Sequence, residues 1–140
     1  MTDADIYRQF TWPVRVYWED TDAGGVVYHT GYLRFMERAR SEWLRAVGVQ
    51  QAELREQQGV MFVLCAAQID FRRAARLDHL LEVCCTVTER KRASLCFRQE
   101  VRDAAGVLVS GVIRVACVDA RTFRPQAIPA GLLPLICISE

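Results

Sequence analysis

One segment of the chain repeats its apolar residues at the spacing of an α-helix. Between Gly31 and Val47 they stand three or four positions apart, while charged residues mostly take the other faces. The pattern predicts a helix of about five turns. Thr30 is a candidate N-cap of this helix, and Gly48 is typical of the residue at which a helix ends. A shorter helical segment is expected over residues 51–58.

Other segments carry the alternation and the β-branched residues that are typical of strands. The predicted strands span residues 11–19, 60–71, 80–90, 93–101 and 107–118. Small and polar residues at 103–106 fit a hairpin turn, and prolines predict an extended or turned tail from Ala120. One long helix with several antiparallel strands implies an α+β fold, in which a sheet of about five strands wraps around the helix. Such a sheet keeps an open edge, so a homo-oligomer is expected.

Length and composition fit one soluble domain. The 140 residues, of which 51% are hydrophobic and 25% charged, predict a single domain over residues 1–140. A net charge of +1 gives no field that would gather nucleic acid or an anionic membrane. The longest apolar run, Val60 to Ala67, is too short to span a membrane. Because the N-terminus is acidic, unlike a secretory signal, a cytoplasmic protein is expected.

Six cysteines stand in apolar stretches, which predicts buried free thiols in a reducing compartment. They are Cys65, Cys84, Cys85, Cys96, Cys117 and Cys137. Their spacing matches neither a redox motif nor a set of zinc ligands, so no metal is expected. The sequence also contains no nucleophile elbow, phosphate-binding loop or zinc-protease motif.

The segment from Glu19 to Tyr32 carries the candidate chemistry, because acids and glycines lead directly into the predicted long helix. The first turn of a helix has unpaired N–H groups and a positive dipole end, which stabilise a carbonyl oxygen that gains negative charge. A carboxylate on the loop could attack that carbonyl or activate water, and Gly24 and Gly25 would let the backbone approach a substrate. Alternatively, Asp20 and Asp22 only cap turns, and the glycines only supply positive φ angles. The spacing does not choose between the two acids.

Several other residues allow two interpretations each. His29, at the helix start, either donates a hydrogen bond in a site or has a structural role, and His79 fits a surface turn. Tyr28 and Tyr32 either line a pocket or pack in the core. The basic turn Arg90-Lys91-Arg92 is either solvated or in contact with a phosphate.

Two stretches, Val14 to His29 and Tyr32 to Arg40, closely resemble the acyl-CoA thioesterases associated with the bacterial Tol-Pal system. These are the YbgC type, in the 4-hydroxybenzoyl-CoA thioesterase branch of the hotdog-fold superfamily. Weaker similarity continues through Ala75 to Asp78 and Val115 to Asp119. The resemblance implies a hotdog fold, a long helix wrapped by an antiparallel sheet. It also implies dimers that form edge to edge, further assembly into tetramers, and active sites at the dimer interface.

The resemblance also implies roles for individual residues. Asp22 matches the family's catalytic aspartate, whereas Asp20 is the motif's other acid, and the N–H that polarises the thioester carbonyl falls at about His29. The expected catalytic residues are therefore Asp22 and His29. Contacts with the substrate are expected from Gly25, Val26, Tyr28 and Tyr32 and, for the nucleotide of CoA, from Arg90, Lys91 and Arg92. No metal or organic cofactor is expected.

The implied reaction is hydrolysis of an acyl-CoA or acyl-carrier-protein thioester to a free acid and a thiol. The aspartate would serve either as the nucleophile or as the general base for water. The alternative is a non-catalytic protein of the Tol-Pal cell-envelope system that binds acyl carrier protein or acts as a scaffold. A dehydratase would need a histidine matched with a helical carboxylate, and the predicted helix offers only Glu37 and Glu42, without such a histidine.

Overall fold

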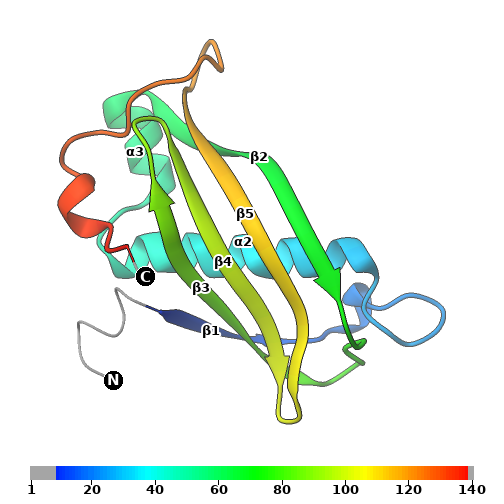
Figure 1. The fold of residues 1–140 in the computed structure, drawn as a ribbon. Helices are drawn as coiled ribbons and strands as arrows, with labels where there is room; N and C mark the ends of the chain where they lie inside the picture. Colours follow the sequence, from blue (N-terminus) through cyan, green and yellow to red (C-terminus); the bar gives the residue numbers. More distant parts are fainter. Residues whose placement is uncertain (1–8, 139–140) are drawn as a thin grey trace.

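The computed structural model of the chain describes residues 9–138, which form one antiparallel sheet and two α-helices (Figure 1). The five strands stand in the order β1-β3-β4-β5-β2, so β1 and β2 are the edges of the sheet. The strands are β1 (Phe10–Arg15), β2 (Val60–Phe71), β3 (Leu80–Arg90), β4 (Ser94–Asp103) and β5 (Gly106–Asp119). The helices are α2 (His29–Ala46) and α3 (Gln51–Gln58). The predicted α+β class, the five strands and the second short helix are confirmed.

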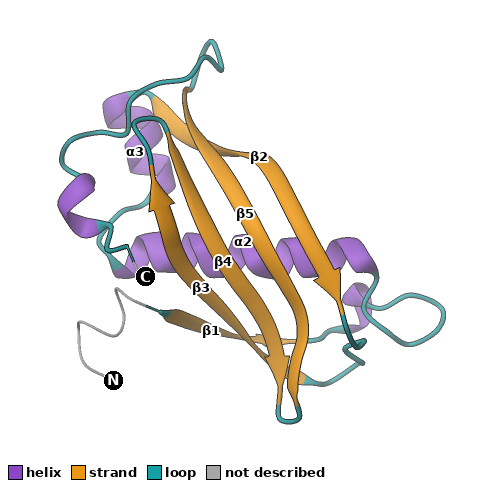
Figure 2. Ribbon diagram, in the orientation of Figure 1, coloured by secondary structure: helices purple, strands orange, loops and turns teal. Residues whose placement is uncertain are grey.

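The long helix α2 lies across one face of the curved sheet (Figure 2). Its buried side includes Phe35, Met36 and Ala39, each with no exposed surface, and it forms the centre of the core. The ring of Trp43 meets the edge of Phe97 from β4 at a centroid distance of 5.4 Å. These apolar positions are the ones that the helical spacing predicted, because a helix packed on one sheet face buries a single stripe.

The start of α2 differs from the prediction, and Thr30 is not its N-cap. Tyr28 holds the N-cap position in an extended conformation, and no side chain caps this helix end. The Gly31 amide donates to the Tyr28 carbonyl at 2.8 Å, which places Thr30 inside the first turn. The capping preference of threonine is a local tendency. The position of the helix start follows instead from the loop of residues 21–27 that delivers the chain to it.

The first strand is shorter than predicted. β1 ends at Arg15, and the segment Trp18–Asp20 forms a 3₁₀ helix. The amide of Asp20 donates to the Tyr17 carbonyl at 3.0 Å, and the Tyr17 amide donates to the Asp20 carboxylate at 2.8 Å. This reciprocal pair of bonds turns the chain out of the sheet, and it overrides the alternation that predicted a strand to residue 19.

The edge strand β2 is apolar in sequence but largely exposed. Leu64 and Phe71 are 50% and 53% exposed, because β2 pairs with β5 on one side only. The prediction that all the cysteines are buried is therefore wrong. Cys65 on β2 and Cys137 in the tail are exposed and Cys96 is half-buried, whereas the remaining three, Cys84, Cys85 and Cys117, are buried on interior strands.

The tail after β5 is irregular apart from a 3₁₀ turn at Leu133–Leu135, in agreement with its prolines. Its apolar side chains Ile128, Leu132 and Ile136 are buried against the core. Across residues 9–138, neither α-helix combines the length and the apolar character that crossing a bilayer would require.

Candidate active site

The loop before α2 is a tight hairpin. Thr21 pairs with Val27 in an antiparallel bridge. The Asp22 amide donates to the Val26 carbonyl at 2.9 Å, and the Gly25 amide donates back to the Asp22 carbonyl at 3.0 Å. Gly25 has a φ of 77°, which residues with a Cβ atom adopt only at a cost. The glycine therefore permits the turn that brings Asp22 back towards the start of α2.

The Asp22 side chain is exposed at this hairpin. Its Oδ1 accepts a hydrogen bond from the Gly24 amide at 2.8 Å, while Oδ2 has no partner among residues 9–138. The side chain borders a cleft of about 380 Å³. The cleft is lined by Trp18, Thr21, Asp22, Ala23, Gly25 and Leu77. A carboxylate that is held through one oxygen and open at the other can attack a carbonyl or accept a proton.

The neighbouring acid Asp20 has the opposite environment. It is 3% exposed, and its Oδ2 accepts the Tyr17 amide at 2.8 Å. Its Oδ1 lies 3.8 Å from the guanidinium of Arg34 on α2. Asp20 therefore fixes the approach of the chain to the helix and is not accessible to a substrate.

The N-terminus of α2 offers hydrogen-bond donors beside the hairpin. Within the part of the chain that the structure describes, the amides of His29 and Thr30 make no hydrogen bond. The His29 side chain is exposed, and its ring lies 4.0 Å from the ring of Tyr28 and 6.5 Å from that of Phe71 at the end of β2. Free amides at the positive end of a helix can polarise a carbonyl oxygen.

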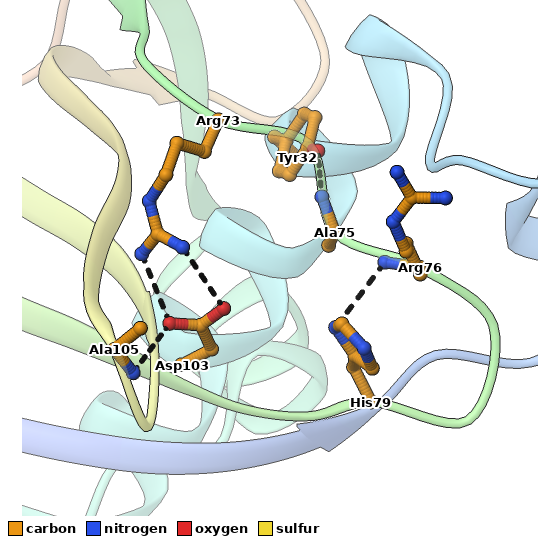
Figure 3. Close-up of polar contacts among 7 residues, drawn as sticks. All are labelled: Tyr32, Arg73, Ala75, Arg76, His79, Asp103 and Ala105. Atoms are coloured by element: carbon orange, nitrogen blue, oxygen red, sulfur yellow. Dashed lines mark hydrogen bonds and ion pairs between the residues drawn. The ribbon is translucent and has the colours of Figure 1, made fainter.

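Tyr32 lies in the core, not in the cleft. It is 3% exposed, and its hydroxyl accepts the amide of Ala75 at 2.9 Å (Figure 3). Burial raises the pKa of the Tyr32 phenol, and the bond from Ala75 partly opposes this rise. Ala75 in turn accepts the Val27 amide at 2.9 Å, and Arg76 pairs with Val26. Tyr32 therefore holds the segment before β3 against the Asp22 hairpin.

A second tie fixes the same segment from its other side. The Arg73 guanidinium donates to the Asp103 carboxylate at 3.0 Å, and the Ala105 amide donates to the same carboxylate at 2.8 Å (Figure 3). The Arg73 hydrogen bond, aided by the Ala105 amide, lowers the pKa of Asp103. In the turn between these ties and β3, His79 Nδ1 lies 3.4 Å from the amide of Arg76, as expected for a surface turn.

The basic turn Arg90-Lys91-Arg92 is not part of the Asp22 site within one chain. It joins β3 to β4, at the far end of α2 from the Asp22 hairpin (Figure 1). Arg90 donates to the Leu133 carbonyl at 2.9 Å, and the Lys91 ammonium lies 3.4 Å from the Glu89 carboxylate. All three side chains are exposed, and Arg90 also bonds the tail.

A second concave site lies between α2 and β2. It is a cavity of about 120 Å³ with a mostly apolar wall and a few polar side chains. Its lining residues are Glu37, Arg40, Ser41, Trp43, Leu44, Gln51, Phe62, Leu64, Leu95, Phe97 and Val115. Throughout residues 9–138, no group of three His, Cys, Asp or Glu side chains is placed so that it could hold a metal ion.

Comparison with known proteins places this chain in a family. The model of the thioesterase-like superfamily matches residues 16–136. This chain belongs to that superfamily. It is 48% identical to the acyl-CoA thioesterase YbgC of Haemophilus influenzae, over 86% of this chain and 88% of the relative. It is 42% identical to the acyl-CoA thioester hydrolase YbgC of Escherichia coli, over 89% and 92% of the two chains.

A solved structure shows the same fold. The crystal structure of a probable thioesterase from Bartonella henselae superposes with a TM-score of 0.81 at 33% identity, covering 85% of this chain and 98% of that one. The resemblance to YbgC thioesterases, the hotdog fold and the class of enzyme, a thioester hydrolase, are confirmed.

Sequence patterns missed three residues that border the candidate site of this thioesterase. Trp18 lines the Asp22 cleft and is 80% exposed, and its place directly before the acidic motif was a usable signal. Leu77 lines the same cleft from a distant part of the chain. Phe71 ends β2 and meets the His29 ring. For Leu77 and Phe71 no local signal existed, because only the packing of β2 and the following segment brings them to α2.

Proposed function

We propose that this thioesterase hydrolyses acyl-CoA thioesters and that Asp22 supplies the reacting carboxylate. One observation carries the proposal: an exposed carboxylate with a free oxygen lies on a hairpin that leads directly into a helix with unpaired N-terminal amides. The names of the two YbgC relatives support the acyl-CoA substrate. The same 4′-phosphopantetheine thioester, carried on acyl carrier protein, is a second form of substrate that this chemistry would accept.

In the proposed reaction the thioester carbonyl oxygen accepts hydrogen bonds from the amides of His29 and Thr30. Asp22 then acts in one of two ways. As general base it removes a proton from water while the water oxygen attacks the carbonyl carbon; as nucleophile it attacks that carbon itself, and water later cleaves the anhydride. In both versions the C–S bond breaks, the sulfur leaves as thiolate and takes up a proton, and the free acid is released. Both require an ionised Asp22 and donors at the developing oxyanion.

The complete site is proposed to need two copies of the chain. β2 has an uncovered edge, and antiparallel pairing of β2 with its copy about a two-fold axis would close it. Phe71, at one end of β2, contacts His29, whereas Phe62 and Leu64, towards the other end, line the cavity on α2. Antiparallel pairing brings the Phe71 end of one copy beside the Phe62 end of the other. The Asp22 hairpin of one subunit would therefore face the cavity of its partner.

In the proposed pairing, the basic turn would lie near the substrate of the partner subunit. The turn lies at the end of the molecule away from Asp22, so within a dimer it approaches the hairpin of the other copy. With Arg90 engaged by Leu133, Lys91 and Arg92 are the proposed contacts for the phosphates of CoA. We further propose a cytoplasmic location, which the free state of all six cysteines supports.

Release of free CoA from a panel of short, long and aromatic acyl-CoAs tests the reaction. Asp22→Asn keeps an oxygen that can accept the Gly24 amide but removes the base and nucleophile. We expect hydrolysis to fall by about 100-fold or more, without loss of folding. Glu19→Gln, a neighbouring exposed acid, is the matched control and should retain activity. Full activity in Asp22→Asn would refute the assignment, and tight acyl-CoA binding without turnover would favour a scaffold or carrier-binding role.

A further inference from the structure

The cavity between α2 and β2 has a cationic group in an otherwise apolar wall. Arg40 reaches it from α2, and its guanidinium donates to the side-chain oxygen of Gln99 at 2.9 Å. No carboxylate lies within ion-pair distance of Arg40 among residues 9–138. Burial lowers the pKa of Arg40, with the neighbouring Cys85 and Glu37 acting in the opposite direction. The arginine is therefore partly desolvated without a formal counter-charge.

Gln99 holds this guanidinium in place. The Gln99 side chain has no exposed surface, and its Nε2 donates to the Met36 carbonyl at 3.0 Å and faces the Cys84 carbonyl at 3.5 Å. Both neighbours of Nε2 are acceptors, so the amide can take only one orientation, with Oε1 towards Arg40. The hydrogen bond between Arg40 of α2 and Gln99 of β4 therefore fixes one edge of the guanidinium and leaves its other N–H donors available.

Glu37, the acidic side chain that lines the same cavity, accepts a hydrogen bond from another group. Ser41 donates its hydroxyl to the Glu37 carboxylate at 2.8 Å, and Gln51 donates to the Ser41 hydroxyl at 2.9 Å. This chain of bonds holds Glu37 at the polar rim of the cavity. Phe62, Leu95 and other apolar side chains form the remaining wall. A ligand that matches this wall is apolar along its length and carries an oxygen acceptor that reaches Arg40.

We propose that the cavity receives the far end of the substrate's acyl group and that Arg40 selects acyl groups bearing an oxygen acceptor there. The inference rests on the proposed thioester hydrolysis and on the two-fold pairing that brings Asp22 of one copy to this cavity. A volume of about 120 Å³ is similar to the roughly 150 Å³ of a protein cavity that binds benzene. The acyl group is therefore short or a single ring. Its acceptor is a carboxylate or a hydroxyl oxygen.

Two pairs of substrates of matched shape distinguish a carboxylate acceptor from a hydroxyl acceptor. Glutaryl-CoA and 5-methylhexanoyl-CoA differ by a terminal carboxylate in place of two methyl groups. 4-Hydroxybenzoyl-CoA and 4-methylbenzoyl-CoA differ by a hydroxyl in place of one methyl group. We expect the native enzyme to prefer the oxygen-bearing member of at least one pair by about tenfold in kcat/KM, mainly through KM. The pair that shows the preference identifies the acceptor.

Substitution of Arg40 then tests its part in the choice. Arg40→Met should abolish the preference, and Arg40→Lys should keep part of it. Arg38→Met, on the same helix but exposed, is the matched control and should leave the ratio unchanged. If Arg40→Met does not fold, comparison of the kcat/KM ratio of Arg40→Lys with that of the native enzyme still tests whether Arg40 selects the acyl group.

Three outcomes overturn the inference in distinguishable ways. Equal or reversed ratios in the native enzyme, with ready hydrolysis, reject the selection by Arg40 and leave the proposed function standing. An unchanged ratio in a folded Arg40→Met rejects the role of this residue. Conversion of Arg40→Met to a monomer in light scattering would show that Arg40 pairs with an acid of the second copy. Failure of the native enzyme to hydrolyse any acyl-CoA would instead reject the proposed function.

Discussion

At the scale of single residues, two aspartates in one motif have separate tasks. Asp20 is buried, accepts the Tyr17 amide and lies near Arg34, whereas Asp22 is exposed beside the cleft. The two acids are only two positions apart, but they lie in different local structures. The 3₁₀ turn at Trp18–Asp20 directs the Asp20 side chain inward, and the hairpin presents the Asp22 side chain outward. The inner carboxylate serves the shape of the site, and the outer one is available for chemistry.

The contrast leads to a prediction on stability. Asp20→Ala leaves the Tyr17 amide without its acceptor and removes the carboxylate near Arg34, so we expect the free energy of unfolding to fall by about 1–3 kcal/mol. Chemical denaturation monitored by circular dichroism measures the change. Asp22→Ala removes only an exposed bond to Gly24 and should cost less than half as much. Equal losses in the two variants would contradict the structural role of Asp20.

At the scale of elements, the site is assembled from segments that are distant in sequence. The hairpin before α2 touches the segment before β3 through Val27 and Ala75, and Tyr32 of α2 holds that segment by its hydroxyl. The tie between Arg73 and Asp103 fixes the same segment to the β4–β5 turn. The position of Asp22 therefore depends on contacts that run from α2, through the segment before β3, to the β4–β5 turn.

Tyr32→Phe tests this connection. The change keeps the buried ring but leaves the Ala75 amide without an acceptor, so we expect a loss of about 1–3 kcal/mol in stability. Amide hydrogen exchange should become faster at Ala75 and Val27, while the central strands β3 and β4 keep their protection. Tyr17→Phe is the control, since that side chain is 60% exposed. Unchanged exchange at Ala75 would show that the hydroxyl does not hold the segment.

At the scale of the whole molecule, the uncovered edge of β2 is the main feature that one chain leaves open. Apolar side chains on an unpaired edge invite association, and here the edge runs from the His29 end of α2 to the cavity at Arg40. Assembly and activity should therefore be lost together. A monomer would keep Asp22 and the helix amides but lack the cavity that a partner supplies.

Charges on this edge test the coupling. Ala66→Lys with Gln68→Lys puts two positive charges near the middle of β2, beside Arg114 and opposite the same charges of a second copy. We expect a folded monomer in light scattering and a loss of hydrolysis of about tenfold or more. Gln9→Lys with Pro13→Lys adds equal charge at the other edge of the sheet, beside β3, and should change neither property. A fully active monomer would reject the shared site.

The order of residues along the chain determined by itself most of the secondary structure of this thioesterase and the location of its candidate site. Helical spacing predicted the apolar stripe that α2 buries. The strand patterns predicted the bounds of β2, β3, β4 and β5 to within about two residues, and only the first part of the predicted first strand forms β1. The acidic and glycine-rich motif marked the loop that holds Asp22. Each of these features depends on neighbours a few positions apart, through backbone geometry and the burial of one face.

The tertiary structure decided which of these residues is free to act. It buried Asp20, placed the Tyr32 hydroxyl on Ala75, occupied Arg90 with the tail, and left Cys65 exposed on the edge strand. It also set Arg40 against Gln99 in the wall of a cavity. Burial and hydrogen-bond partners of this kind come from segments far apart in the chain, so periodicity and spacing carry no record of them.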